Sequence, residues 1–416
     1  EISPADNHTF GTNQAYFPFV WDGSGNPTIT GLANFGQDSS FAGNKTAQGN
    51  QDGNEIGDFY YEPPSGFLAL CTKNLPDVAV TPSEHFNTVL YSGNGADDRA
   101  ITVGFQPDWT WVKTRSHAQS HRLYDAVRGA DRALVSDTTQ AEFSGSADEL
   151  QSFDTNGFTM DDGFNQSGYN YVAWNWKANG SGSANTNGSI NSTVSANTDA
   201  GFSIVSYTGT GANATVGHGL SGAPEMMIVR CRSAANAWAI YHKDIGNTHL
   251  LEFSTAAKAD NDSFWNDTTP TSSVFTIGSH NQVNHTETFQ AWCFHSVTGY
   301  SKFGSYTGNG STTGPSVTTG FKPAFLMVKE TVAGGGWLMV DNTRNPTNPT
   351  TLRLSANTSG AEDNSTDNSV DFNDTGFQIK TSSGSWNQNG VAIIYMAFAD
   401  KREYAYWLDQ SGNNND

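Results

Sequence analysis

Apolar residues in this chain fall in short runs that are separated by turns rich in Gly, Asn and Ser. One pattern recurs three times: an aromatic residue, a Gly-rich turn, a Thr/Val-rich run, a proline, and an apolar run that a basic residue closes. The copies span Tyr91–Lys113, Tyr207–Arg230 and Tyr306–Lys329. Short apolar runs between turns are typical of buried strands. The pattern therefore predicts three copies of one β-rich unit.

The spacing within the three copies is nearly constant. The proline follows the leading tyrosine by 16 residues in the first copy and by 17 residues in the other two. A second apolar run ends 18 residues after the proline in every copy, at Asp125, His242 and Asp341. We therefore expect one topology around the three prolines. These are Pro107, Pro224 and Pro323.

Composition and the repeat boundaries divide the chain into five parts. Residues 1–86 form a partial β segment with a linker, residues 87–187, 188–299 and 300–406 form three repeats, and residues 407–416 form a linker toward a further segment. A repeat of about 100 residues is long enough for a sandwich or jelly-roll domain and too long for a solenoid unit. We expect an all-β protein of tandem sandwiches with little helix.

The first segment carries its own apolar clusters. Asp58–Tyr61 and Phe67–Cys71 are expected to be strands on either side of a Pro-Pro-Ser-Gly turn. Aromatic residues also gather near the start of the chain, at Phe10, Tyr16, Phe17, Phe19 and Trp21.

The chain is acidic, with a formal net charge of −20 over 416 residues. Nucleic-acid binding needs clustered Lys and Arg, so the charge argues against a nucleic-acid partner and against anionic membrane surfaces. Salty surroundings would screen the repulsion within such a chain. No run of apolar residues is long enough to insert into a membrane.

Three cysteines occur, at Cys71, Cys231 and Cys293, and their spacing fits no zinc pattern. The last two lie in the second repeat, where they could form a local disulfide or remain two buried thiols. The other copies carry Thr114 and Glu330 at the position of Cys231. At the position of Cys293 they carry Asn175 and, on this alignment, Asp400 or its neighbour.

Motifs for known catalysis are missing from the sequence: it has no nucleophile elbow, phosphate loop or HExxH motif. No cofactor is expected. Calcium is the one metal considered, because acidic turns supply oxygen ligands, although no complete calcium loop is present. The candidate ligands are Asp97, Asp98, Asp161 and Asp162.

Carboxylates and aromatic residues divide into recurring and single-copy positions. Asp125 and Asp341 occupy equivalent positions in two repeats. We therefore expect structural roles at strand ends for them, and not the pair of facing catalytic carboxylates of a glycosidase. Aromatic residues that recur are expected in the core. Those found in one copy only, Trp109, Trp265 and Trp386, are candidates for stacking on a glycan, with burial as the alternative for each.

The order of these motifs resembles a known family. PPSGFLALCTKNLP, YSGNG, GFQPDWTWVK, LYDAVRG, SFDTNGF and YVAWNWKA are similar to segments of an uncharacterised tandem β-repeat family in tail-fibre-like proteins of marine bacteriophages. The second and third copies match through GFSIVSYTGTGANATVGHGL and GYSKFGSYTGNGSTTGP. Residues 28–75 resemble the end of the SPRY-type, concanavalin-like sandwich that often precedes such repeats.

The resemblance implies a non-enzymatic virion structural protein, a tail fibre or appendage located outside the cell. Expected partners are other virion proteins, host surface glycans and further copies of the chain, with a trimer as one arrangement. Sandwiches joined by short linkers would form a stiff rod. The alternatives are a bacterial cell-surface adhesin or filament subunit, a capsid decoration protein, and a carbohydrate-active enzyme.

Overall fold

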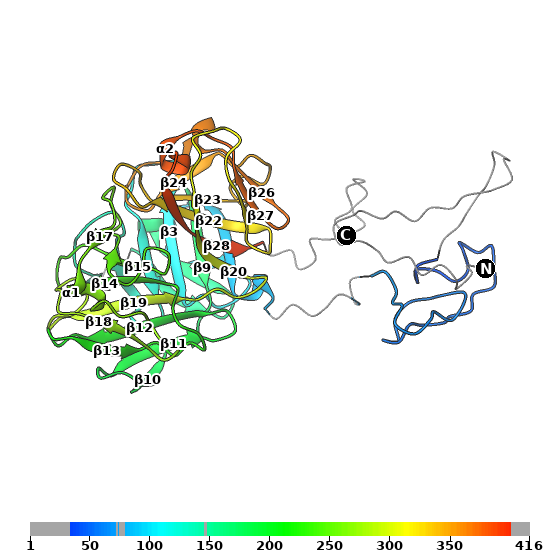
Figure 1. Ribbon diagram of the computed structural model, residues 1–416, viewed down its shortest axis with the longest axis horizontal. Helices are drawn as coiled ribbons and strands as arrows, with labels where there is room; N and C mark the ends of the chain where they lie inside the picture. Colours follow the sequence, from blue (N-terminus) through cyan, green and yellow to red (C-terminus); the bar gives the residue numbers. More distant parts are fainter. Residues whose placement is uncertain (1–33, 72–73, 75–79, 145–147, 401–416) are drawn as a thin grey trace. The chain divides into compact units, whose positions relative to one another are not determined.

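The computed structural model describes residues 34–71, 74, 80–144 and 148–400 (Figure 1). The chain forms two compact units, Glu1–Asp77 and Val78–Asp416. The aromatic cluster predicted at residues 10–21 and the linker at 407–416 lie outside the described residues.

The described part of the first unit is irregular. One isolated antiparallel bridge joins Asn50 to Phe59, and the expected turn is present, with the Phe67 N–H donating to the Pro64 carbonyl over 3.0 Å. The two strands predicted around this turn do not form, because a strand needs a neighbour to pair with and only Phe59 has one here. Large apolar side chains are exposed as a result. They are Phe35, Tyr61, Phe67, Leu68 and Leu70.

The second unit confirms the all-β prediction, since its described residues contain two short helices and many antiparallel strands. Its first repeat is a sandwich of a six-stranded sheet, ordered 1-9-3-4-5-6, and a three-stranded sheet, ordered 2-8-7. The elements are η2 (Pro82–Glu84), β1 (Phe86–Ser92), β2 (Arg99–Thr102), β3 (Trp109–Thr114), β4 (Arg122–Asp125), β5 (Gly129–Leu134), β6 (Phe143–Ser144), β7 (Leu150–Asp154), β8 (Gly157–Met160), η3 (Asp162–Phe164) and β9 (Asn170–Trp176).

The second repeat adds a hairpin at its start and holds the helix α1. Its six-stranded sheet is ordered 10-11-12-19-14-15, and strands 13 and 18 form the smaller layer. The elements are β10 (Ser183–Asn185), β11 (Ser192–Asn197), β12 (Phe202–Thr208), β13 (Ala214–Gly217), β14 (Met226–Cys231), β15 (Ala239–His242), β16 (His249–Leu250), β17 (Ala259–Asp260), α1 (Asp262–Trp265), β18 (Val274–Ile277) and β19 (Thr288–Phe294).

The third repeat returns to the pattern of the first. Its sheets are ordered 20-28-22-23-24-25 and 21-27-26. The elements are β20 (Ser301–Thr307), β21 (Ser316–Thr318), β22 (Pro323–Glu330), β23 (Leu338–Asp341), β24 (Leu352–Ser355), β25 (Asp363–Asn364), η4 (Thr366–Asn368), β26 (Val370–Asn373), β27 (Gly376–Ile379), α2 (Gly384–Asn387) and β28 (Ala392–Ala399).

The prediction of one topology in three copies is confirmed. In every copy the last long strand (β9, β19 or β28) lies between the strand that carries the leading tyrosine (β1, β12 or β20) and the strand at or after the proline (β3, β14 or β22). The register corrects the alignment of the third copy. Trp174 lies opposite Trp111, and Met396 lies opposite Met327, so Met396 is the counterpart of Trp174. Likewise Ala397, not Asp400, is the counterpart of Asn175.

Hydrogen bonds explain the tyrosine that opens each repeat. The Tyr91 hydroxyl donates to the Phe164 carbonyl over 2.8 Å, and the next residue, Asn165, is buried and accepts the N–H of Asn94 in the Gly-rich turn. A Cβ on Gly93 would lie 1.9 Å from the Gln166 carbonyl oxygen, so only glycine fits there. The same bonds join Tyr207 to Val283 and Tyr306 to Trp386. The repeated signature is therefore scaffold.

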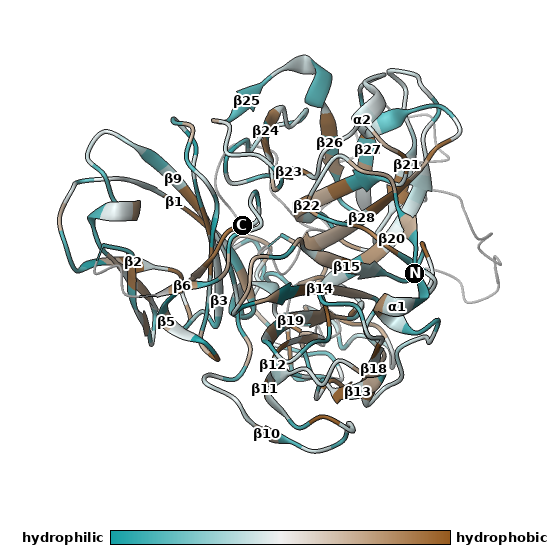
Figure 2. Cartoon of the chain, turned by 90° about the vertical axis from the view of Figure 1, so that its left-hand side faces the viewer, coloured by the Kyte–Doolittle hydropathy of each residue, from teal (hydrophilic) through white to brown (hydrophobic). Residues whose placement is uncertain are grey.

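The three large sheets face one shared core, whereas separate sandwiches in a rod were expected. One buried cluster draws on all three repeats, and Figure 2 shows the apolar strands β3, β14 and β22 meeting at the middle of this unit. Aromatic contacts cross between repeats, with Trp109 and Trp292 ring centroids 5.4 Å apart and those of Trp174 and Phe325 5.8 Å apart. The rod prediction is wrong for this chain, because the outward faces of the sheets are apolar and bury one another.

Three equivalent hydrogen bonds close the repeats into a ring. The Trp238 indole N–H of repeat two donates to the Val135 carbonyl of repeat one over 3.1 Å. The Trp337 indole of repeat three donates to the Glu252 carbonyl of repeat two over 2.6 Å. His121 of repeat one bonds the Ser355 carbonyl of repeat three over 3.0 Å. Its Nδ1 accepts from Trp111, so its Nε2 is the donor.

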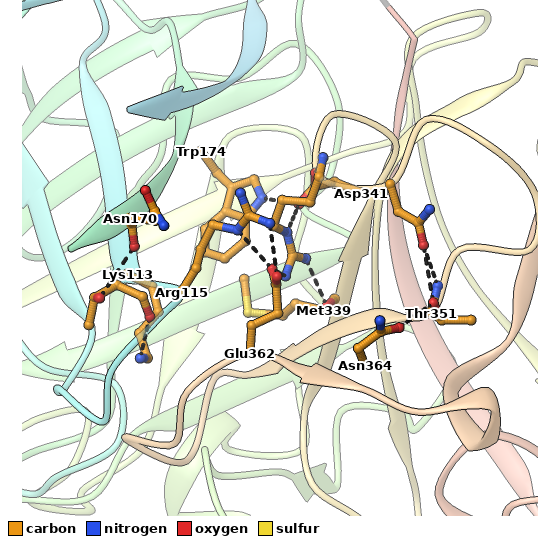
Figure 3. A network of polar contacts seen from close by, with 12 residues as sticks. Lys113, Arg115, Asn170, Trp174, Met339, Asp341, Thr351, Glu362 and Asn364 are labelled. Atoms are coloured by element: carbon orange, nitrogen blue, oxygen red, sulfur yellow. Dashed lines mark hydrogen bonds and ion pairs between the residues drawn. The ribbon is translucent and has the colours of Figure 1, made fainter. Parts of the chain in front are cut away.

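Chains of ion pairs, buried within one repeat and partly exposed where they cross to the next, reinforce two of the three interfaces. Arg344 of repeat three contacts Asp341 at 2.5 Å and Glu362 at 3.1 Å, and Glu362 reaches Arg115 of repeat one at 2.8 Å (Figure 3). The Trp174 indole of repeat one also donates to Asp341 over 3.0 Å. We call this set the Asp–Arg–Glu–Arg relay.

A second Asp–Arg–Glu–Arg relay joins repeats one and two. Arg128 contacts Asp125 at 2.6 Å and Glu142 at 3.1 Å, and Glu142 reaches Arg232 at 2.9 Å. The guanidinium of Arg128 also lies 5.6 Å from the ring centroid of Trp292. The relays give Asp125 and Asp341 the structural roles that the sequence predicts.

The interface between repeats two and three has different residues at the same four stations. The N–H groups of Glu142 and Glu362 donate to the carbonyls of Arg232 and Arg115, and the equivalent bond here runs from Lys258 to Thr331 over 3.0 Å. The Asp and Arg stations hold His242 and Ile245. The His242 Nδ1 accepts the Asp244 N–H, so its Nε2 donates to the Tyr395 carbonyl of repeat three over 3.3 Å.

Candidate functional site

The three tryptophans predicted to stack on a glycan are buried. Trp109 stacks on Trp176 with centroids 4.2 Å apart, inside the shared core. The indole N–H of Trp265 donates to the His249 carbonyl over 3.0 Å, and that of Trp386 donates to Asn368 over 3.2 Å. None of the three is more than 1% exposed. A sugar cannot reach these rings, so the burial alternative holds for all three.

The four calcium candidates serve turns. Asp161 is buried, and its carboxylate accepts the backbone N–H of Asp98 over 2.6 Å, while Asp97 and Asp162 are exposed. Within the described parts of the chain, no group of three or more His, Cys, Asp and Glu side chains could hold a metal ion.

The two cysteines of the second repeat are free and buried, which confirms the thiol alternative. Cys231 pairs with Phe289 across the sheet, and Cys293 lies four positions further along β19. That offset places the two Cα atoms roughly 13 Å apart, too far for a disulfide. Burial raises the pKa of the Cys293 thiol and keeps it protonated.

The second repeat differs from its neighbours in its smaller sheet. Strands β7 and β26 complete the three-stranded sheets of the first and third repeats. The second repeat forms no strand at this point, between α1, which follows β17 as η4 follows β25, and β18. Among the described residues its smaller sheet therefore consists of β13 and β18 alone. A cavity beside α1 is lined by Phe264 of that helix.

The cavity, which we call the repeat-two pocket, encloses about 280 Å³. Figure 1 shows α1 and β17 close together at one side of the ring unit. Both polar and apolar side chains line the pocket, from Leu250, Leu251, Glu252, Ala256, Ala257, Ala259, Asn261, Phe264, His280 and Gln282.

Two acceptor groups belong to the polar lining of the repeat-two pocket. The Gln282 amide N–H donates to Glu252 Oε1 over 3.0 Å, which leaves the other carboxylate oxygen for a ligand. The Gln282 Oε1 atom is buried and has no hydrogen-bond partner among the described residues. A buried acceptor without a partner costs free energy, which a donor placed against this atom would recover.

His280 supplies a donor to the same lining. Its ring stacks on Phe264, with centroids 3.9 Å apart, and its Nδ1 accepts the backbone N–H of Gln282 over 3.3 Å. The proton of the neutral ring is therefore on Nε2. Burial lowers the pKa of His280, and the nearby Glu252 carboxylate opposes that shift, so the imidazole is neutral at neutral pH.

Glu252 is specific to the second repeat. Its carbonyl accepts the ring-closing bond from Trp337, as the carbonyls of Val135 and Ser355 do at the other interfaces. The three residues therefore occupy one station, and only the second repeat places a carboxylate there. Sequence reasoning missed Glu252, because the station becomes recognisable only when the ring bonds are known.

Residues 81–402 match a family described as a domain of unknown function (DUF7483). The chain belongs to this family. The match covers the first two repeats and residues 300–402 of the third. No curated protein matches the chain. Neither α1 nor α2 is long and apolar enough to cross a membrane, and the described residues contain no other helix that is.

Proposed function

We propose that the chain is a non-enzymatic structural protein of a bacteriophage virion, a tail fibre or appendage that contacts host surface glycans. The resemblance of its motifs to tail-fibre-like proteins supports the virion assignment. The proposal includes association with other virion proteins and with further copies of the chain. It places the glycan contact at the repeat-two pocket.

One observation carries this proposal: the polar residues that recur serve the scaffold, while three polar residues specific to the second repeat line a cavity. The recurring tyrosines and asparagines fix turns, and the recurring aspartates form relays. The repeat-two pocket instead joins Glu252, His280 and Gln282 on a rigid ring. A rigid framework that presents a variable site is typical of recognition proteins. The ring then acts as a compact head and not as a rod.

Antibody labelling in negative-stain electron microscopy tests the location. Antibodies against the second unit are expected to decorate the tails or appendages of phage particles. Label on capsids would favour a decoration protein. Label confined to bacterial surfaces would overturn the virion assignment and favour the adhesin.

Two further measurements test the function itself. Intact oligomers on a glycan array are expected to bind, and no binding to any glycan would overturn the recognition role. Incubation with algal and bacterial polysaccharides is expected to release no product. Measurable turnover would overturn the non-enzymatic assignment.

A further inference from the structure

We infer that the repeat-two pocket binds one neutral sugar ring and discriminates against acidic sugars. This inference rests on the proposed glycan contact and specifies its ligand class. At about 280 Å³ the pocket lies below the roughly 300–1,000 Å³ of sites for drug-sized ligands, so it suits a single small unit.

The polar lining of the pocket offers both kinds of hydrogen-bonding group. Glu252 and Gln282 present acceptor oxygens, and the neutral His280 presents an Nε2–H donor. A hydroxyl group donates and accepts, so adjacent sugar hydroxyls can satisfy all three. An ammonium group only donates and would leave the imidazole N–H without a partner.

The apolar lining of the pocket suits the C–H face of a pyranose ring. Aliphatic carbons of two leucines and three alanines are part of this lining, in Leu250, Leu251, Ala256, Ala257 and Ala259. A pyranose ring has faces of C–H groups and an edge of hydroxyls. Burying its C–H face removes apolar surface from water while the edge meets the polar groups.

Charge excludes acidic ligands. No Lys or Arg is among the described residues that line the pocket, and the Glu252 carboxylate is one of its polar groups. The whole chain carries a net charge of −20. A sugar carboxylate or sulfate would therefore be repelled by Glu252 without a cation among the lining residues, Lys258 being exposed between Ala257 and Ala259.

Saturation-transfer NMR and titration calorimetry on the full chain test the inference. The probes are methyl glycosides of glucose, galactose and mannose, N-acetylneuraminic acid, methyl glucuronide, and n-butylamine as a cation. At least one neutral glycoside is expected to bind, and both acids are expected to bind at least tenfold more weakly. Binding of the amine alone, or equal binding of neutral and acidic sugars, would overturn the inference.

Paired variants assign the binding to the pocket. Glu252→Gln keeps the shape and removes a charged acceptor, and is expected to weaken glycoside binding about tenfold. Gln282→Met removes the unpartnered acceptor and is expected to weaken it about fivefold. Asp260→Asn is the matched control, because it removes the same charge from an exposed residue beside the pocket. It is expected to leave binding unchanged.

The variant outcomes separate this inference from the proposed function. Thermal melts of each variant show whether the fold persists. If wild-type protein binds glycosides and Glu252→Gln binds equally well, the site lies elsewhere and this inference fails while the glycan contact stands. If antibody labels only cells, the virion assignment fails whatever the pocket binds.

Discussion

The interfaces that repeat one makes with its two neighbours differ in chemistry from the interface between repeats two and three. All three share the central core and one ring-closing hydrogen bond. Repeat one meets each neighbour through an Asp–Arg–Glu–Arg relay. Repeats two and three meet through His242 and Ile245, with no relay.

The contacts present at all three interfaces close the ring, whereas the relays are additional interactions at two of them. Apolar burial and the indole-to-carbonyl bonds suffice at the interface without a relay. A buried ion pair often contributes little net stability, because desolvating its charges offsets their attraction. The repeat-two pocket is lined by residues of the second repeat alone, among them Glu252, Ala256 and Ala257, which precede Lys258 at the interface without a relay.

The strongest test removes the centre of one relay. Arg344→Met leaves Asp341 and the largely buried Glu362 short of a cation, so we expect a loss of about 3–5 kcal/mol in the free energy of unfolding. Urea denaturation measures it. Ile245→Met at the equivalent station is the matched control, with an expected loss below about 1.5 kcal/mol. Equal losses at the two stations would show that the relays do not distinguish the interfaces.

Transplanting the relay tests the same idea in reverse. His242→Asp alone buries a carboxylate without a cation and is expected to lose about 3 kcal/mol. Adding Ile245→Arg, Lys258→Glu and Thr331→Arg supplies the other members, and we expect at least half of the loss to be recovered. Urea midpoints of the single and quadruple variants give the comparison. A quadruple variant less stable than His242→Asp would refute the equivalence of the stations.

The interface without a relay should respond to acid through His242. Burial lowers the pKa of His242 to about 4, against the effects of Asp244, Glu225 and the Tyr395 carbonyl, while Lys243 adds to the lowering. Above pH 6.5 the His242 imidazole is neutral in both the folded and the unfolded protein. Between pH 6.5 and about 4 only the unfolded state takes the proton, so stability falls by about 1.4 kcal/mol per pH unit.

The control for the pH effect is His242→Gln, which cannot titrate. The slope of unfolding free energy against pH in this window is expected to be shallower than in the wild type by about 1.4 kcal/mol per pH unit. Urea titrations at four pH values measure both slopes. Parallel slopes would mean that His242 is not neutral in the folded ring.

The smallest expected change in unfolding free energy is that of a substitution at Glu252. Its carboxylate is partly exposed and bonded only to Gln282 among the described residues, so Glu252→Gln should change unfolding free energy by less than about 0.5 kcal/mol. Glu362→Gln, within a relay, should cost more. A large loss for Glu252→Gln would assign this residue to the scaffold instead of the pocket.

The sequence predicts the topology of each repeat well, because constant offsets around Pro107, Pro224 and Pro323 fix where strands begin and end. The shared core was missed, although its signal was present. Every residue of β3 is buried, whereas a strand of an isolated two-layer sandwich buries one face. Apolar residues on both faces, such as Trp111 beside Val112, indicate two cores and therefore a further layer.

The candidate site could be predicted only in part. Comparison of the three repeats directs attention to residues that differ between them. By that criterion Trp109 and Trp265 are candidates, but both side chains are buried. Glu252, His280 and Gln282 are separated along the chain and come together only in the folded repeat. Local sequence does not encode that convergence, since it depends on how the segments after β16 and β18 pack.

The first and last strands of the ring are in contact. Phe86, in the first strand, stacks on Phe398, in the last, with centroids 5.1 Å apart. A circular permutant that joins these ends and opens the chain between β9 and β10 would keep every sheet intact. For the same reason the whole ring can be carried as an insertion within a loop of a larger host protein, because its two attachment points demand almost no separation.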